Sequence, residues 1–263
     1  MEGRIPPIVS IITPYFKAQG TIKETILSVQ NQTFTDWELI IIDDNSEDNV
    51  ELYLADLLGK DNRIRVIKNS ERKGAAGARN SGIENAVGQY IAFLDSDDLW
   101  GRDKLSAQLS FMQSNNCSFS YGDYYSFSKT DESGLPEVIG SFSAPNQLTF
   151  SELCNTCSIG CLTVMLDRSK LQDVYLPYTD KEDYALWLKL SKQDIIAYNY
   201  GGCDAYYRVG KNSLSSNKFK EVVRQYRVVR KVAGLSRVKA VWALLNYVYF
   251  GLKKHKNYRS SND

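Results

Sequence analysis

The sequence predicts an α/β domain whose first half forms a mainly parallel sheet. Apolar, β-branched stretches such as IVSIITPYF (8–16) and WELIIIDDNS (37–46) alternate with stretches such as TIKETILSVQNQ (21–32), in which apolar residues recur at helical spacing. Continuous apolar strands separated by helices are typical of parallel sheets that are covered on both faces. With 263 residues, the chain is long enough for one large α/β domain or two small ones.

Strands and helices alternate regularly up to about residue 116. The predicted strands cover 8–16, 37–46, 63–69 and 89–98, and the predicted helices cover 21–32, 49–60, 74–86 and 101–115. Beyond that point the alternation weakens, and we expect strands at 117–127, 136–142 and 161–167, a helix at 181–193, and a hairpin or paired strands at 195–200 and 205–209. This half should complete the sheet and supply the second half of the site.

Polar residues gather where the predicted strands end. In open α/β sheets, ligands bind outside the carboxyl ends of the strands. The residues at these ends are Thr13, Pro14 and Tyr15 after the first strand, Asp43 and Asp44 after the second, and Asp95, Ser96 and Asp97 after the fourth. We therefore expect the ligand site at this rim.

The segment FLDSDD (93–98) places three carboxylates within four residues. Asp95 and Asp97 form a DXD motif, in which two carboxylates on one turn can face a single divalent cation. Oxygen ligands favour Mg²⁺ or Mn²⁺, which commonly bridge to substrate phosphates. The alternative is that Asp97 or Asp98 caps the following helix, an interaction that stabilises by about 1 kcal/mol. One cap needs one acid rather than three, which favours the metal site.

Three other polar positions have both a functional and a structural interpretation. Asp44 could accept a hydrogen bond from a ribose or a base, or it could cap the next helix. Arg79, in the Gly-led segment GAAGARN (74–80), could contact a phosphate or a base, or it could be an exposed arginine on a tightly packed helix. Glu182 and Asp183 could stabilise the start of a helix through its dipole, or one of them could act as a general base. The single histidine, His255, lies in the basic tail, so a general base is expected to be a carboxylate.

The chain contains five cysteines, an odd number that argues against a disulfide framework and favours a reducing compartment. Cys154, Cys157 and Cys161 are spaced by three and then four residues. This spacing favours three small apolar side chains on one buried helical face. A metal cluster is the alternative, although a fourth nearby ligand is missing.

Charge divides the chain into an acidic body, 1–216, and a basic tail, 217–263. The tail holds twelve Lys and Arg against two acids, a net charge of +10, so the body carries −9 of the total of +1. Its segment VKAVWALLNYVYFGL (238–252) is too short and interrupted to span a bilayer, which takes roughly 20 apolar residues. We expect a helix that lies on a membrane surface, with a helix packed on the domain as the alternative. No signal peptide is expected, and the acidic body fits nucleic acid poorly.

Four motifs in order resemble the inverting glycosyltransferases of family two, which have the GT-A fold. The motifs are VSIITPYFKA, QTFTDWELIIIDDNSEDN, NSERKGAAGARNSGIENAVGQYIAFLDSDDLW and KEDYALWLKL. The resemblance covers 8–116 almost continuously and resumes around 180–215, whereas 117–178 matches loosely. It implies a UDP-sugar donor, a cation (Mn²⁺ or Mg²⁺), and a glycan or lipid-linked saccharide as acceptor. The basic tail, with its interfacial aromatic residues, separately predicts peripheral contact of 217–263 with the cytoplasmic face of the membrane, where a lipid-linked acceptor would be used in surface polysaccharide synthesis.

The resemblance also implies roles for individual residues. Pro14 and Tyr15 would pack against the base, Asp44 would bind it, Arg79 would contact the nucleotide, Asp95 the ribose or sugar, and Asp97 the metal. Asp183 would be the general base of a single inverting displacement. The donor-binding set also includes Thr13 and Ser96, and Glu182 and Trp187 are possible acceptor contacts.

One departure from the family pattern concerns the metal. Many members carry a His after the YR strand, but the stretch here is YYRVGKNSLS (206–215). Arg208 or Lys211 could contact the diphosphate instead, and a third metal ligand stays unassigned.

Two alternative functions remain. A sugar nucleotidyltransferase should have a Gly-rich loop with Arg and Lys in the first strand–helix turn, where this chain has TPYFKAQG. A non-catalytic nucleotide-sugar or glycan-binding protein would bind without turnover, and Asp183 argues against it.

Overall fold

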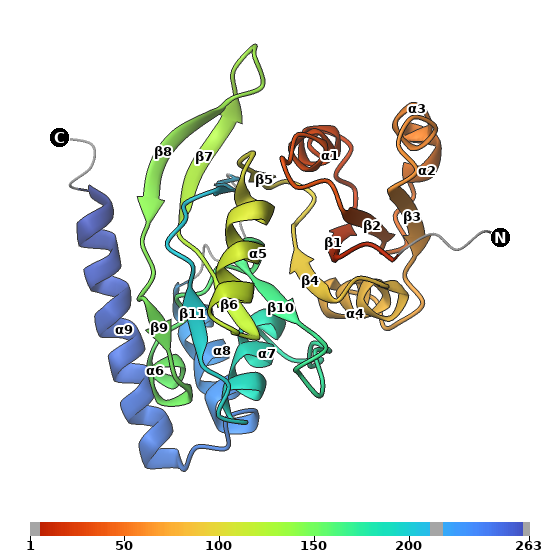
Figure 1. Ribbon diagram of the computed structural model, residues 1–263. Helices are drawn as coiled ribbons and strands as arrows, with labels where there is room; N and C mark the ends of the chain where they lie inside the picture. The colour runs from red at the N-terminus through yellow and green to blue at the C-terminus, as the bar shows by residue number, and fades with distance from the viewer. Residues whose placement is uncertain (1–5, 211–217, 260–263) are drawn as a thin grey trace.

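The expected alternation of strands and helices is present in a computed structural model that describes residues 6–210 and 218–259 (Figure 1). The helices are α1 (Ile22–Gln30), α2 (Val50–Tyr53), α3 (Ala55–Leu58), α4 (Ala75–Asn85), α5 (Lys104–Ser114), α6 (Phe150–Asn155), α7 (Glu182–Ser191), α8 (Lys218–Lys231) and α9 (Arg237–Arg259). A short 3-10 helix covers Cys161–Thr163.

The larger sheet has the order β3-β2-β1-β4-β10-β6-β11-β9. Its strands are β1 (Val9–Tyr15), β2 (Trp37–Asp43), β3 (Ile64–Lys68), β4 (Tyr90–Phe93), β6 (Phe119–Tyr121), β9 (Gln147–Leu148), β10 (Met165–Asp167) and β11 (Ala197–Asn199). The first four strands in this order are mutually parallel, and β10 then joins β4 in the antiparallel sense. The second half of the chain therefore completes the sheet, as expected.

Alternate residues of the central strands enter two separate cores, because successive side chains of a strand point to opposite faces. Ile12 and Ile42 belong to the core that also contains residues of α4 and α7. Ile11 and Ile41 belong to the core that contains residues of α1 and α5. Both faces of the sheet are covered, which explains why these strands are apolar without interruption.

The smaller sheet has the order β5-β12-β7-β8. Its strands are β5 (Leu99–Trp100), β7 (Tyr124–Thr130), β8 (Pro136–Phe142) and β12 (Ala205–Arg208). The antiparallel ribbon of β7 and β8 projects from the body (Figure 1). The expected pairing of 195–200 with 205–209 is wrong, since β11 pairs with β6 and β9 of the larger sheet while β12 pairs with β5 and β7. Each of the two strands pairs with other strands instead of forming a local hairpin. Gly201, between them, has a φ of 81°, a left-handed conformation that glycine adopts readily.

Two other local expectations change. The helix expected over 49–60 is divided into α2 and α3, which meet at the buried Leu54. Its cap is Asn49, whose side chain accepts a hydrogen bond from the amide of Leu52. Asp44 therefore does not cap this helix, and its carboxylate has other partners.

The described part of the tail packs on the domain. Val228 and Val229 of α8 and Ala240 of α9 join the core that contains α7. Gln225 of α8 donates a hydrogen bond to the hydroxyl of Tyr184, at 2.9 Å. Helix α9 runs along one flank of the molecule, beside β8 and α6 (Figure 1). None of the helices within residues 6–210 and 218–259 is long and apolar enough to cross a membrane.

Candidate active site

The carboxyl ends of β1 and β2 meet at one rim of the larger sheet. Tyr15 and Asp43 are register partners, and the amide of Asp44 donates to the carbonyl of Tyr15 at 2.9 Å. The carboxylate of Asp44 accepts hydrogen bonds from Asn69 Nδ2 at 2.6 Å and from the amide of Gly74 at 2.9 Å. These contacts join the end of β2 to the start of α4 and hold the Asp44 carboxylate in one orientation.

Tyr15, the aromatic residue expected to pack against the base, is buried. Tyr15 and Thr13 have no exposed surface, and the Tyr15 hydroxyl donates to Asp48 Oδ2 at 2.5 Å. Burial, and then Asp48, raise the pKa of Tyr15 far above its usual value. The expectation that the Tyr15 ring packs directly against the base is therefore not met in this structure, because the core covers the ring. Pro14 and Phe16 retain exposed surface at the same rim.

Arg79 of α4 is buried, which corrects the alternative of an exposed arginine. Its Nη2 donates to Asp95 Oδ1 at 2.5 Å, and its Nη1 donates to Glu182 Oε1 at 2.8 Å. Burial opposes the charge, but the carboxylates of Asp95, Glu182 and Asp183 hold the pKa of Arg79 well above its usual value. Arg79 therefore joins the rim of the sheet to the start of α7, a connection that the sequence does not reveal.

Close backbone packing explains a glycine in the same segment. An ideal Cβ on Gly77 would lie 1.7 Å from the carbonyl oxygen of Arg72. Only glycine lets the first turn of α4 approach this loop this closely, and Arg79 follows two residues later in the same helix. The GAAGARN segment thus serves helix packing and, through Arg79, the site.

Asp98 and Arg208 join the FLDSDD loop to β12. The buried carboxylate of Asp98 accepts from the amide of Arg208 at 2.8 Å, while Arg208 Nε donates to the carbonyl of Asp97 at 2.7 Å. Burial, and then the charges of Asp95 and Asp97, raise the pKa of Asp98 well above its usual value. The N-cap of α5 is Asp103, so the interpretation of Asp97 or Asp98 as its cap is wrong.

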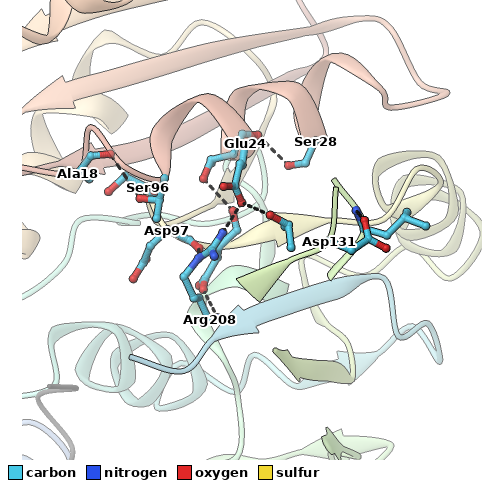
Figure 2. A network of polar contacts seen from close by, with 12 residues as sticks. Ala18, Glu24, Ser28, Ser96, Asp97, Asp131 and Arg208 are labelled. Carbon is cyan, nitrogen blue, oxygen red and sulfur yellow. Dashed lines mark hydrogen bonds and ion pairs between the residues drawn. The ribbon is translucent and has the colours of Figure 1, made fainter. Parts of the chain in front are cut away.

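Arg208 lies between the loop and α1, as Figure 2 shows. Its Nη2 donates to Glu24 Oε2 at 2.6 Å, and its guanidinium lies 4.4 Å from the centre of the Phe127 ring. The Thr21 hydroxyl of the same helix donates to the carbonyl of Ser96 at 2.9 Å. Arg208 therefore supports the loop through existing contacts, and Lys211 lies outside the described residues.

Asp97 presents the exposed carboxylate of the loop. Limited hydration, and then the charge of Asp95, raise its pKa, while Arg208 opposes them. Within residues 6–210 and 218–259, no group of three or more His, Cys, Asp or Glu is arranged to hold a metal. Mg²⁺ is commonly held by one or two carboxylates together with water and substrate phosphates. The exposed Asp97 carboxylate in a region of excess negative charge fits such a cation.

Helix α7 begins with Glu182 and Asp183. Asp183 Oδ1 accepts from the amide of Tyr184 at 2.7 Å. Burial, and then the charge of Glu182, raise the pKa of Asp183, while Arg79 opposes them. Asp183 is thus a carboxylate of enhanced basicity next to the Arg79 cluster, as a general base requires.

Trp187 is a core residue. It is 1% exposed, and its ring packs against Phe93 and Phe119. The expectation of a direct acceptor contact is therefore wrong, because the indole lies on the side of α7 that faces the sheet.

Sequence reasoning missed Cys161 as a neighbour of the site. The Cys161 thiol interacts with the charges of Arg79, Asp95 and Asp183, and burial raises its pKa well above the usual value. The expectation of three cysteines on one helical face is also wrong. Cys154 lies in α6, which ends at Asn155, whereas Cys161 begins the 3-10 helix. None of the five cysteines, all of which lie within the described residues, forms a disulfide.

Similar proteins were found by sequence and by structure. The family model "Glycosyl transferase family 2" matches residues 10–171. The chain is 43% identical over 249 residues to the UDP-Glc:alpha-D-GlcNAc-diphosphoundecaprenol beta-1,3-glucosyltransferase WfgD of Escherichia coli, covering 94% of this chain and 95% of WfgD. It is 41% identical to the putative teichuronic acid biosynthesis glycosyltransferase TuaG of Bacillus subtilis, covering 94% of this chain and 97% of TuaG.

Solved structures confirm the expected GT-A fold. The mannosyltransferase PcManGT of Pyrobaculum calidifontis, in complex with GDP-Man and Mn²⁺, superposes with a TM-score of 0.67 at 15% identity, covering 92% of this chain and 73% of that one. TarS 1-349 of S. aureus, in complex with UDP-GlcNAc, gives 0.61 at 18% identity, covering 91% and 71%. The family match, the high identity over nearly the whole chain and the shared fold agree, and the protein belongs to glycosyl transferase family 2.

Proposed function

We propose that the protein transfers a sugar from a UDP-sugar to a hydroxyl of a lipid-linked saccharide, with inversion at the anomeric carbon, in surface polysaccharide synthesis. The relative WfgD is named for a UDP-Glc donor and a diphosphoundecaprenol-linked acceptor, and TarS was solved with UDP-GlcNAc. These names support a UDP donor and an acceptor of this class.

The two ion pairs made by Arg79 are the main support for the proposal. The guanidinium contacts Asp95 at the end of β4 and Glu182 at the start of α7. A donor bound at the rim of the sheet would thus lie next to Asp183, the candidate base. A carboxylate of raised pKa beside this rim supports turnover rather than binding alone.

The donor would lie across the ends of β1, β2 and β4. Asp44, already oriented by Asn69 and Gly74, would accept from the base. Pro14 and Phe16 offer exposed surface beside it. The remaining donor contacts we propose are Arg79 to the nucleotide, Asp95 and Ser96 to the ribose or sugar, and Arg208 or Lys211 to the diphosphate.

The reaction would be one in-line displacement. Asp183 takes the proton from the acceptor hydroxyl, and the hydroxyl oxygen forms a bond to the anomeric carbon. The bond from that carbon to the diphosphate oxygen breaks, and UDP leaves with the electron pair. Attack from the opposite face converts an α-linked donor sugar into a β-linked product. A divalent cation at Asp97, Mn²⁺ or Mg²⁺, would offset the negative charge that grows on the leaving diphosphate.

The first test is titration calorimetry of UDP with the full chain, with and without Mn²⁺. We expect cation-dependent binding that Asp97→Ala abolishes. Asp56→Ala, an exposed acid on α3, is the matched control and should bind UDP as the original chain does. Equal binding with and without Mn²⁺ would remove the cation from the proposal, and an absence of UDP binding would refute the donor assignment.

The second test is turnover. UDP-glucose and a GlcNAc-diphosphate carried on a polyprenyl chain are the first donor and acceptor to try. Product formation with inversion, lost in Asp183→Asn although UDP still binds, is the expected result. Retention of configuration at the anomeric carbon would contradict a single displacement, and UDP binding without turnover on a donor and acceptor panel would favour a binding protein.

A further inference from the structure

Helix α9 exposes an apolar row along one side. The row, which we call the α9 face, consists of Val238, Val241, Trp242, Leu245, Val248 and Tyr249. These residues recur every three or four positions, so they share one face of the helix, and the row is roughly 17 Å long. Trp242 is 66% exposed and Val238 is 81% exposed. Apolar residues on the surface are ordinary when scattered, but a continuous row of this kind indicates a binding surface.

The opposite side of α9 is already occupied. Ala240 and Ala243 are buried against the domain, and Asn246 donates to Asn155 of α6 at 2.9 Å. The helix therefore cannot rotate to bury the α9 face without losing these contacts. An amphipathic helix usually hides its apolar side in the core, but here small alanines face the core and the large apolar side chains face outward.

We propose that the α9 face docks on an anionic lipid bilayer. The charge around it complements such a surface. Arg237 and Lys239 are exposed at its start, and the sequence that follows it carries Lys253, Lys254, Lys256 and Arg259. Trp and Tyr beside apolar residues, with Lys and Arg around them, are the composition of helices that lie in the membrane interface. Basic residues next to such a helix are attracted by anionic headgroups.

The docked tail is tied to the candidate base. Lys181 Nζ lies 3.2 Å from Glu221 of α8 and 3.2 Å from the hydroxyl of Tyr247 of α9. Lys181 directly precedes Glu182 and Asp183. This step rests on the proposed function: a bilayer held at α9 would place the start of α7 close to the surface from which a lipid-linked acceptor is presented.

The distribution of tryptophans gives a direct probe. The chain has four, and Trp37, Trp100 and Trp187 are at most 4% exposed. Trp242 alone is exposed, so a lipid-dependent change in tryptophan emission reports on α9. The experiment mixes the full chain with vesicles of phosphatidylcholine, or of phosphatidylcholine and phosphatidylglycerol, whose acyl chains carry bromine as a quencher.

With anionic vesicles we expect the emission to shift to shorter wavelength and to be quenched, and raising the salt should weaken both effects. The variant Val241→Glu/Leu245→Glu keeps the tryptophan and should reduce vesicle co-sedimentation by about tenfold or more. Leu52→Glu, at an exposed leucine of α2, is the matched control and should co-sediment as the original chain does.

Unchanged Trp242 emission in anionic vesicles, or equal co-sedimentation of the double variant, would overturn the proposal. So would a dimer by light scattering without lipid that Val241→Glu/Leu245→Glu converts to a monomer, because the α9 face would then belong to a second copy. Titration of UDP with the same preparations separates the two ideas: vesicle docking without UDP binding would refute the proposed donor and leave the docking surface intact.

Discussion

Arg79 Nη1 lies 2.8 Å from Glu182 Oε1, although 103 residues separate the two in the sequence. The contact joins α4, at the rim where we propose that the donor binds, to the helix that carries Asp183. Because the same guanidinium also pairs with Asp95, one side chain fixes the loop after β4 relative to the start of α7.

Arg79→Gln should destabilise the protein by about 2–3 kcal/mol, less than for a fully buried pair, because the Asp95 and Glu182 side chains that lose their cation are 34% and 24% exposed. The measurement is urea unfolding followed by circular dichroism. Lys129→Ala removes the exposed pair with Glu137 and should cost at most about 1 kcal/mol. A cost for Arg79→Gln no larger than that of this control would contradict the buried ion-pair cluster.

Glu182→Gln should shift the acid limb of the pH–rate profile to lower pH. Burial, and then the charge of Glu182, raise the pKa of Asp183, while Arg79 lowers it. Removing the negative charge of Glu182 eliminates the second of these effects and leaves Arg79 without one of its partners. Because the proposed base would act as a carboxylate, a lower pKa would keep it active in more acidic solution. The measurement is kcat/KM against pH, and a limb that moves upward or stays in place would rule out this account.

Lys104 should make the folded state more stable as pH rises. Burial lowers the pKa of Lys104 to about 7, although Asp204 opposes the shift, and its Nζ lies 3.8 Å from the centre of the Trp100 ring. Between about pH 7 and its ordinary value, the unfolded chain holds a proton that the folded chain lacks, so stability increases with pH over this window.

Lys104→Met tests this directly, because a methionine of similar length needs no charge in the core. We expect the variant to be more stable near neutral pH by up to a few kcal/mol, with a smaller rise in stability from about pH 6.5 to about pH 9. Urea unfolding at several pH values measures both the stability near neutral pH and its rise with pH. A destabilised variant whose stability still rises with pH as much as that of the original chain would show that another group causes the pH dependence.

Arg208→Lys should weaken cation-dependent UDP binding by about tenfold, as is typical when a residue that orients a metal ligand is changed. Lysine keeps the charge but cannot reach both the carbonyl of Asp97 and Glu24 with the geometry of the guanidinium. Calorimetry with Mn²⁺ measures the change, and circular dichroism checks the fold. Arg224→Lys, which alters the pairs of Arg224 with Glu221 of α8 and with Asp180 ahead of α7, should bind UDP normally. Unaltered binding in Arg208→Lys would mean that the loop keeps its shape without this support.

Local patterns in the sequence were enough for the parallel strands of the first half, most of the helices and the placing of acids at the strand ends. A buried parallel strand must be apolar throughout, and a polar residue directly after it must lie at the rim, so Asp44, Asp95 and Asp97 could be placed without coordinates. The excess of Lys and Arg after residue 217 is likewise visible in composition alone.

The tertiary structure decided the contacts between distant segments. Trp187 faces the core, Tyr15 is covered, β11 and β12 enter different sheets, and α9 turns its alanines rather than its tryptophan toward the domain. Each outcome depends on which of several apolar or charged partners packs best between segments far apart in the sequence, and helical or strand periodicity contains no information about that choice.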